Sequence, residues 1–105
     1  MSLVINPVGE KSLMVPQTTK QLVTVLNENG LHARPATLIA KTASEFASDI
    51  TLERNGQVVN AKSVISILIL AASKGTTLTL RACGEDRESA VAAVSELFRQ
   101  RFNEV

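Results

Sequence analysis

The fold is set by residues 21–47, which read QLVTVLNENGLHARPATLIAKTASEFA. The first part, Leu22 to Leu26, is rich in Val and Leu with Thr24 between them, which is typical of a largely buried strand. The cluster Asn27 to Gly30 then predicts a turn. Apolar residues recur after this turn at spacings of three and four, which predicts a helix; they are Ala36, Ile39, Ala40, Ala43 and Phe46 or Ala47.

The start of this helix is indicated by Pro35. Proline is tolerated in the first helical turn, because the N–H that it lacks has no partner within the helix and its φ is already helical. We therefore expect the helix to begin within a residue or two of Ala33 and His32 to lie close to the N-cap.

Two further strands follow this helix. Asp49 to Arg54 alternates between apolar and polar residues, and Gln57 to Asn60 comes after Asn55-Gly56. An Asn-Gly pair between two such runs is a strong signal for a β-hairpin.

The rest of the chain predicts a helix, a strand and a helix. Ser63 is a suitable N-cap for a short helix in VISILIL, residues 64–70, with Gly75 as a later stop. Thr76 to Ala82 alternates as a strand does, and a final helix is expected from Asp86, as its cap, to Arg101. Four short strands, each with at most one apolar face, and three helices predict an α+β fold in two layers.

We expect an open-faced β-sandwich of order strand-helix-strand-strand-helix-strand-helix, in which three helices cover one face of a mostly antiparallel four-stranded sheet. Residues 1–19 contain Pro7, Gly9 and Pro16 without a sustained period, and are interpreted as an arm, a linker remnant or a cloning remnant. Residues 20–105 form the predicted domain.

Composition excludes several classes of function. A formal net charge of +1 and three aromatic residues, all Phe, argue against nucleic-acid binding. No apolar run reaches the length of about 18 residues that a membrane span needs. Cys83 is the single cysteine and His32 the single histidine, so an internal disulfide, a cysteine-based metal cluster and a classical metal site are all disfavoured, and a reducing, cytoplasmic location is expected.

A reactive site is expected at the predicted helix start that carries His32 and Arg34. A neutral imidazole is a nucleophile, and the unpaired N–H groups of the first turn together with Arg34 could bind the oxygens of a phosphoryl group that it accepts. The sequence places no carboxylate beside His32 that could orient it. A small hydrolase that uses His32 and Arg34 is therefore the least favoured class of function.

Four segments then indicate a family. They are NGLHARP at residues 29–35, NAKS at 60–63, KGT at 74–76 and GED at 84–86. Together they resemble HPr, the histidine-containing phosphocarrier of the bacterial phosphoenolpyruvate-dependent phosphotransferase system, over residues 20 to about 102. The family fold is an open-faced β-sandwich with the element order predicted above.

The resemblance implies roles for three residues. His32 would take a phosphoryl group on Nδ1 from phosphorylated enzyme I and pass it to an EIIA-type acceptor. Arg34 would stabilise the phosphate and help to release it, and Asn29 would help to order the loop. The phosphoryl group would be carried covalently without metal or other cofactor, and no independent turnover is expected.

A docking surface is expected near His32. The resemblance implies that the short helix after Ser63 contacts both partner classes, and apolar residues that its length cannot bury are candidates; they are Val64, Ile65 and Leu68, with Leu38 from the first helix. Lys41 and Lys62 are candidates for electrostatic guidance toward acidic partners. Ordinary core packing for the apolar residues and solvated surface charges for the lysines are the alternatives.

Ser63 matches a serine that a dedicated kinase phosphorylates in some HPr proteins. That branch typically has Met-Gly soon after the serine, whereas Ile67 and Leu68 follow Ser66 here, so a role as helix cap is favoured. The segment VISILILAASKG and the end LFRQRFNEV are more similar to nitrogen-related HPr paralogues or to HPr domains of multidomain proteins.

The sequence thus predicts a monomeric phosphocarrier whose partners are enzyme I, EIIA-type sugar or nitrogen-branch acceptors and regulatory proteins. The alternative is an HPr-like regulatory binding module whose phosphorylation state controls association with another protein.

Overall fold

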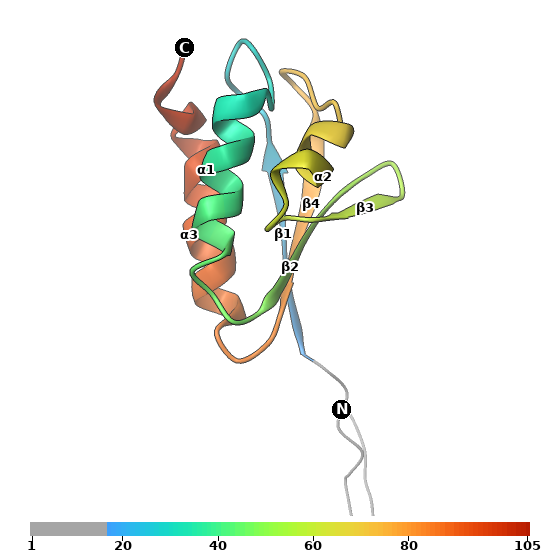
Figure 1. Ribbon diagram of the computed structural model, residues 1–105, viewed down its shortest axis with the longest axis vertical. Coiled ribbons are helices and arrows are strands. Elements are labelled where there is room, and N and C mark those ends of the chain that lie inside the picture. The colour runs from blue at the N-terminus through green and yellow to red at the C-terminus, as the bar shows by residue number, and fades with distance from the viewer. Residues whose placement is uncertain (1–16) are drawn as a thin grey trace, which may run out of the picture.

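The computed structural model describes residues 17–105, so residues 1–16 of the predicted arm lie outside the described part of the chain. The elements follow the predicted order (Figure 1): β1 (Thr18–Thr24), α1 (Ala33–Ala43), β2 (Asp49–Arg54), β3 (Gln57–Asn60), α2 (Val64–Ile69), β4 (Thr77–Cys83) and α3 (Arg87–Arg99), followed by a C-terminal turn (Arg101–Asn103).

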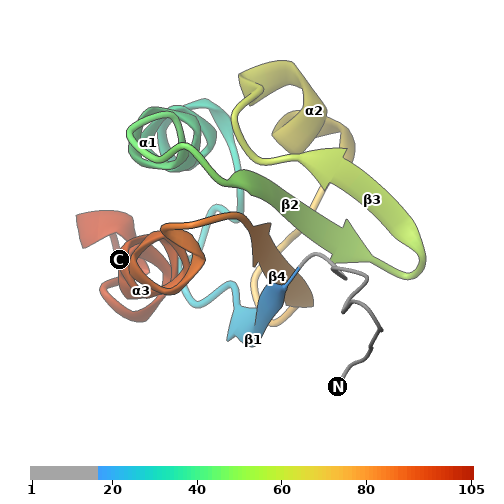
Figure 2. The same cartoon turned by 90° about the horizontal axis from the view of Figure 1, so that it is seen from below.

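The strands form an antiparallel sheet in the order β1-β4-β2-β3. The helices lie on one side of this sheet, as Figure 2 shows. Leu78, Leu80 and Ala82 of β4 are buried toward the helices, as the alternation predicted. Asn55 and Gly56 have φ values of 50° and 85°, which suits the tight turn expected of the β2–β3 hairpin. The predicted two-layer α+β fold is confirmed.

The first strand differs from its prediction. It begins at Thr18, inside the predicted arm, and ends at Thr24, so its polar half was missed. Thr18 pairs with Cys83 at the far end of β4. Leu22, predicted to be largely buried, is 64% exposed. The reason is that β1 is an edge strand of a sheet with one open face, so that only alternate residues reach the core.

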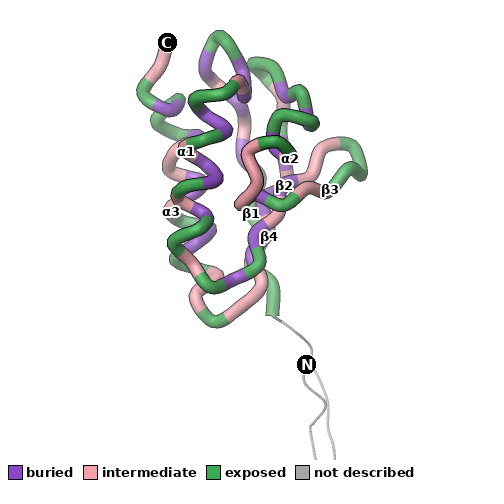
Figure 3. The backbone as a smooth tube through the Cα atoms, viewed as in Figure 1, coloured by how far each residue is buried: buried purple, intermediate pink, exposed green. Residues whose placement is uncertain are grey.

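The helices α1 and α3 present their buried stripes to the sheet (Figure 3). In α1 the buried residues include Ala36, Ile39, Ala40 and Ala43, as predicted. The helix ends at Ala43, so the prediction that its stripe continues to Phe46 or Ala47 was wrong. Phe46 is nevertheless partly buried against the core, whereas Ala47 is exposed.

The short helix α2 was predicted correctly, but Gly75 does not end it. Leu70 is the C-cap, and Ala71 leaves the helix with a φ of 50°. Gly75, with a φ of 91°, instead turns the chain into β4. Within α2 only Ile67 is buried, and Leu70, the residue that follows the helix, is buried as well.

The start of α3 differs from the prediction in its chemistry. Asp86 occupies the N-cap position but makes no capping hydrogen bond with its side chain. Its carboxylate instead accepts hydrogen bonds from the N–H of Ala47 at 2.8 Å, the N–H of Ser48 at 2.9 Å and the Ser48 hydroxyl. Asp86 therefore ties the α1–β2 connection to the start of α3.

The end of α3 also differs, because the helix stops at Arg99 rather than at Arg101. Arg101, Phe102 and Asn103 have φ values of 55°, 53° and 58°, a left-handed conformation that is costly for residues with a Cβ. Phe102 is fully buried, and its ring packs edge to face on Phe98 with centroids 5.0 Å apart. This turn reverses the chain toward the start of α1.

Replacement of Phe102 by Ala should lower the free energy of unfolding by about 3 kcal/mol, the lower end of the range for such truncations, because a terminal segment can partly fray. Urea denaturation measures the change. Val58→Ala, at a position 56% exposed on β3, is the control and should change stability by less than about 0.5 kcal/mol. Equal stabilities of the two variants would contradict the role of Phe102.

Asp86 should make stability depend on acid pH. Hydrogen bonds from the Ser48 hydroxyl and the Ala47 N–H hold the pKa of Asp86 below its ordinary value of 3.8, against an opposing effect of desolvation. The stabilisation is therefore complete above the unfolded-state pKa and is lost as pH falls through the lower folded-state value. The difference in unfolding free energy between the natural protein and Asp86→Asn should shrink from neutral pH to about pH 2; a constant difference in urea denaturation would contradict this account.

Candidate functional site

The loop before α1 is held by close backbone contacts. Gly30 has a φ of 70°, and a Cβ on it would lie 2.6 Å from the carbonyl oxygen of Ala72, so this position requires glycine. The N–H of Leu31 donates to the same oxygen at 2.9 Å, and the Leu31 side chain is buried. These contacts fix the loop against the segment that follows α2, and they thereby set the position of the next residue, His32.

His32 is the N-cap residue of α1, as predicted. Its backbone is extended, with φ −80° and ψ −166°, and its side chain makes no capping hydrogen bond. The imidazole is 40% exposed. The ring therefore stands at a helix start, where backbone N–H groups and the positive end of the helix dipole favour an anion.

A carboxylate lies against this ring, contrary to the expectation that none is near His32. Glu104 Oε1 and Oε2 both lie 3.1 Å from His32 Nε2. The two residues are 72 positions apart in the chain, and the C-terminal turn brings them together. The Glu104 side chain is only 15% exposed, so its carboxylate is packed into the site and is not a solvated surface charge.

Arg34 binds the same carboxylate. Its Nη1 donates to Glu104 Oε2 at 3.0 Å and to the carbonyl oxygen of Phe102 at 2.6 Å. The side chain is 50% exposed. Nε and Nη2 carry three further N–H donors of the guanidinium. The structure thus places His32 and Arg34 together, with Glu104 between them.

These contacts lower the pKa of Glu104. The hydrogen bond from His32 has the largest effect, and those from Arg34 and Asn27 lower the pKa further, while desolvation raises it. The carboxylate consequently stays ionised at neutral pH.

Asn27, which the sequence did not single out, holds the loop. Asn27 is fully buried, and its Nδ2 donates to the carbonyl oxygen of Gly30 at 2.8 Å and to Glu104 Oε1 at 3.0 Å. Asn29 is exposed, and no hydrogen bond of its side chain is found among the described residues. The sequence has no signal that distinguishes the buried Asn27 from the exposed Asn29, because both are common turn residues.

The predicted docking residues fall into two groups. On α2, Ile65 is 73% and Leu68 39% exposed, and Ile69, which was not predicted, is 58% exposed. We call these three residues the α2 patch. Val64 and Leu38 are partly buried against the core, which fits the alternative of core packing. The segment after α2 contacts the loop that carries His32, through Ala72 and Leu31, so α2 borders the site.

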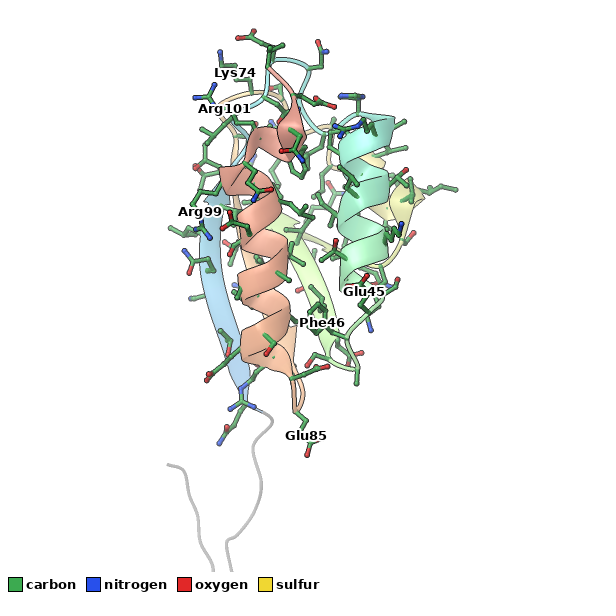
Figure 4. The ribbon with its side chains drawn as sticks, turned by 90° about the vertical axis from the view of Figure 1, so that its left-hand side faces the viewer. Glu45, Phe46, Lys74, Glu85, Arg99 and Arg101 are labelled. Carbon is green, nitrogen blue, oxygen red and sulfur yellow. The ribbon has the colours of Figure 1, made fainter. Side chains whose placement is uncertain are left out.

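The two lysines lie away from the imidazole. Lys41 is exposed in the last turn of α1, whose first residue follows His32. Lys62 Nζ donates at 2.8 Å to the carbonyl oxygen of Phe46, which lies just beyond the C-terminal end of α1 (Figure 4). Both residues are thus near the end of α1 opposite His32. If they attract acidic partners, they do so from the far end of this helix.

Ser63 is the N-cap of α2, and its hydroxyl oxygen accepts a hydrogen bond from the N–H of Ser66 at 3.2 Å. This contact supports the interpretation of Ser63 as a cap.

Among residues 17–105, no cluster of three or more His, Cys, Asp or Glu residues is placed to hold a metal ion. No helix in the described part of the chain is long and apolar enough to cross a membrane.

Comparison with known proteins identifies this arrangement. A family model described as the PTS HPr component phosphorylation site matches residues 19–100. The phosphocarrier protein HPr of Xylella fastidiosa (strain Temecula1 / ATCC 700964) is 49% identical over 82 residues, which are 78% of this chain and 92% of that protein.

Solved structures agree in fold. HPr-C-His from Thermoanaerobacter tengcongensis superposes with a TM-score of 0.80 at 40% identity, covering 83% of this chain and 98% of that one. HPr from Bacillus anthracis str. Ames gives a TM-score of 0.74 at 38% identity, covering 77% and 96%. The family model covers His32 and the chain from the second residue of β1 to the end of α3, and the chain therefore belongs to the HPr family of phosphocarrier proteins of the phosphotransferase system.

Proposed function

We propose that the protein accepts a phosphoryl group on His32 from phosphorylated enzyme I and passes it to an EIIA-type acceptor. The observation that carries this proposal is the half-open imidazole at the N-cap of α1, with a guanidinium two residues further on. Family membership supplies the phosphocarrier chemistry, and the position of His32 supplies the nucleophile for it.

The start of α1 can stabilise the phosphoryl group once it is bound. The N–H groups of Ala33 and Arg34 belong to the first turn and have no acceptor within the helix. The dipole of this helix adds a partial positive charge at the same place. Arg34 adds a full positive charge and the donors of Nε and Nη2, which can hydrogen-bond the phosphoryl oxygens.

The openness of the site suits a carrier. An enclosed pocket would bind the phosphoryl group tightly and exclude the next protein, whereas an imidazole that is 40% exposed leaves the phosphorus accessible to an acceptor. The group is carried covalently, so the proposed relay needs neither metal nor other cofactor. We expect negligible turnover without partner proteins.

Partner proteins would dock on the α2 patch. Three large apolar side chains, Ile65, Leu68 and Ile69, are exposed within five consecutive residues of an element that borders the His32 loop. Exposed apolar surface of this kind is typical of interaction sites. A carrier that presents one face in turn to a donor and an acceptor is expected to act as a monomer.

Substitution of the two site residues tests the relay. With enzyme I and phosphoenolpyruvate, the natural protein should acquire an acid-labile, base-stable phosphate, and His32→Ala should acquire none. Arg34→Met should still be labelled, but about 10 to 100 times more slowly, since a charge-assisted hydrogen bond contributes about 1.5–3 kcal/mol. Radiolabel transfer measures both rates.

Addition of EIIA proteins to the labelled protein tests the second step, in which the label should move to the acceptor. Full labelling of His32→Ala would refute the assignment of the nucleophile. Stable label on His32 in the presence of every EIIA protein tried would refute the relay and favour a regulatory binding module.

A matched pair of surface substitutions tests the docking surface. Ile65→Ser should weaken binding to enzyme I about tenfold, because a side chain of this size contributes about 1.5–3 kcal/mol when it is fully buried at an interface. Leu22→Ser is the control, since Leu22 is 64% exposed, against 73% for Ile65, but lies on β1 at the sheet edge opposite β3. Calorimetric titration measures both affinities, and equal losses in the two variants would exclude the α2 patch as the docking site.

A further inference from the structure

We infer that Glu104, held in place by Asn27, is a positioning residue that fixes the proton of the neutral His32 ring on Nε2 and so presents the lone pair of Nδ1 to the phosphoryl donor. This inference rests on the proposed function and concerns the same site. Glu104 lies beyond residues 19–100, the part of the chain that the family model matches.

The hydrogen-bond chemistry of the carboxylate determines the proton position. An ionised carboxylate has acceptors only, and both oxygens of Glu104 lie 3.1 Å from His32 Nε2. Nε2 must therefore be the donor, and in a neutral imidazole the other nitrogen then carries the lone pair. The two ring nitrogens point in different directions, so the carboxylate at Nε2 does not cover Nδ1.

Asn27 holds the carboxylate in a fixed place. Its Nδ2 donates to Gly30 O and to Glu104 Oε1, whereas its Oδ1 has no partner in the part of the chain that the structure describes. The opposite orientation of the amide would place Oδ1 against two acceptor oxygens, so the observed orientation is the favourable one.

The C-terminal segment is held from both sides of Glu104. The carbonyl oxygen of Phe102 accepts from Arg34, and that of Val105 accepts from the N–H of Glu28 at 2.7 Å. These contacts, together with the burial of Phe102, reduce the loss of conformational entropy that ordering Glu104 at the ring would otherwise require.

The transfer step then needs no proton movement on the ring. The lone pair of Nδ1 forms the N–P bond as the bond between phosphorus and the donor breaks, and the donor keeps the electrons of that bond. The ring retains the Nε2 proton and acquires a positive charge, which lies next to the Glu104 carboxylate and is stabilised by it. When the acceptor attacks phosphorus, the electrons of the N–P bond return to Nδ1.

The proton position can be measured directly, because His32 is the single histidine. In the full chain labelled with ¹⁵N, the imidazole shifts distinguish a protonated nitrogen from one with a lone pair. At a pH about two units above the ordinary imidazole pKa of about 6.5, the natural protein should show Nε2 protonated and Nδ1 unprotonated. Glu104→Ala should move both shifts toward the mixture of tautomers found in a free imidazole.

The rate of phosphorylation by enzyme I supplies the second measurement. Glu104→Gln keeps the shape of the side chain but removes its charge, and it should slow labelling about tenfold. Glu96→Gln is the matched control, because Glu96 lies on α3 in an exposed pair with Arg99. It should change neither the shifts nor the rate.

Unchanged shifts in Glu104→Ala would overturn the inference, as would faster labelling of Glu104→Gln, the result expected if the carboxylate merely blocked the site. Failure of the proposed function is a separate result. In that case the natural protein itself would not be labelled, whereas the ¹⁵N shifts need no phosphoryl donor.

Discussion

Burial of the Phe102 side chain is the interaction on which the geometry of the site depends. The residue follows α3 in a left-handed turn of three residues that all carry a Cβ, a conformation that costs of order 1 kcal/mol or more for each of them. The ring is fully buried and packs edge to face on Phe98, and these contacts offset the strain. The turn places the Phe102 carbonyl on Arg34 and the Glu104 carboxylate on His32. Packing in the core thus decides which charges meet at the surface.

The resulting site balances two opposite requirements of a carrier. A helix start and an arginine attract an anion, and together they would bind a phosphoryl group strongly. Glu104 already accepts hydrogen bonds from Nη1 of Arg34 and Nε2 of His32, and the negative charge of its carboxylate reduces the positive potential at the site. The same carboxylate stabilises the charge that the ring acquires on phosphorylation, on the side of the ring away from phosphorus. Such a site can accept a phosphoryl group and still release it.

Most of the fold was predictable from the sequence because nearly every element is amphipathic. The stripe of α1, the alternation of β4 and the Asn55-Gly56 turn each carry a local signal that survives in the structure. The start of β1 carried none, since the polar residues from Thr18 onward gain their strand structure by pairing with β4, far along the chain. The position of His32 was likewise predictable, because Pro35 marks a helix start.

Glu104 and Asn27 escaped prediction for a different reason: their roles depend on a turn of Arg101, Phe102 and Asn103 whose residue types do not indicate a left-handed backbone.

The distribution of exposed apolar residues follows from element length. A helix of six residues packed on a core can bury only one side, and in α2 this side is occupied by Ile67, with Leu70 three positions later. Ile65, Leu68 and Ile69 therefore stay exposed as a group. The open face of the sheet also exposes two apolar residues, Leu22 on β1 and Val58 on β3. They lie at the two ends of one row of paired residues, and Thr79 and Glu53 stand between them. The exposed apolar residues of the sheet are thus separated from one another, whereas those of α2 lie within five consecutive residues. The grouped apolar surface is on the element beside His32, where a partner protein must bind to reach the imidazole.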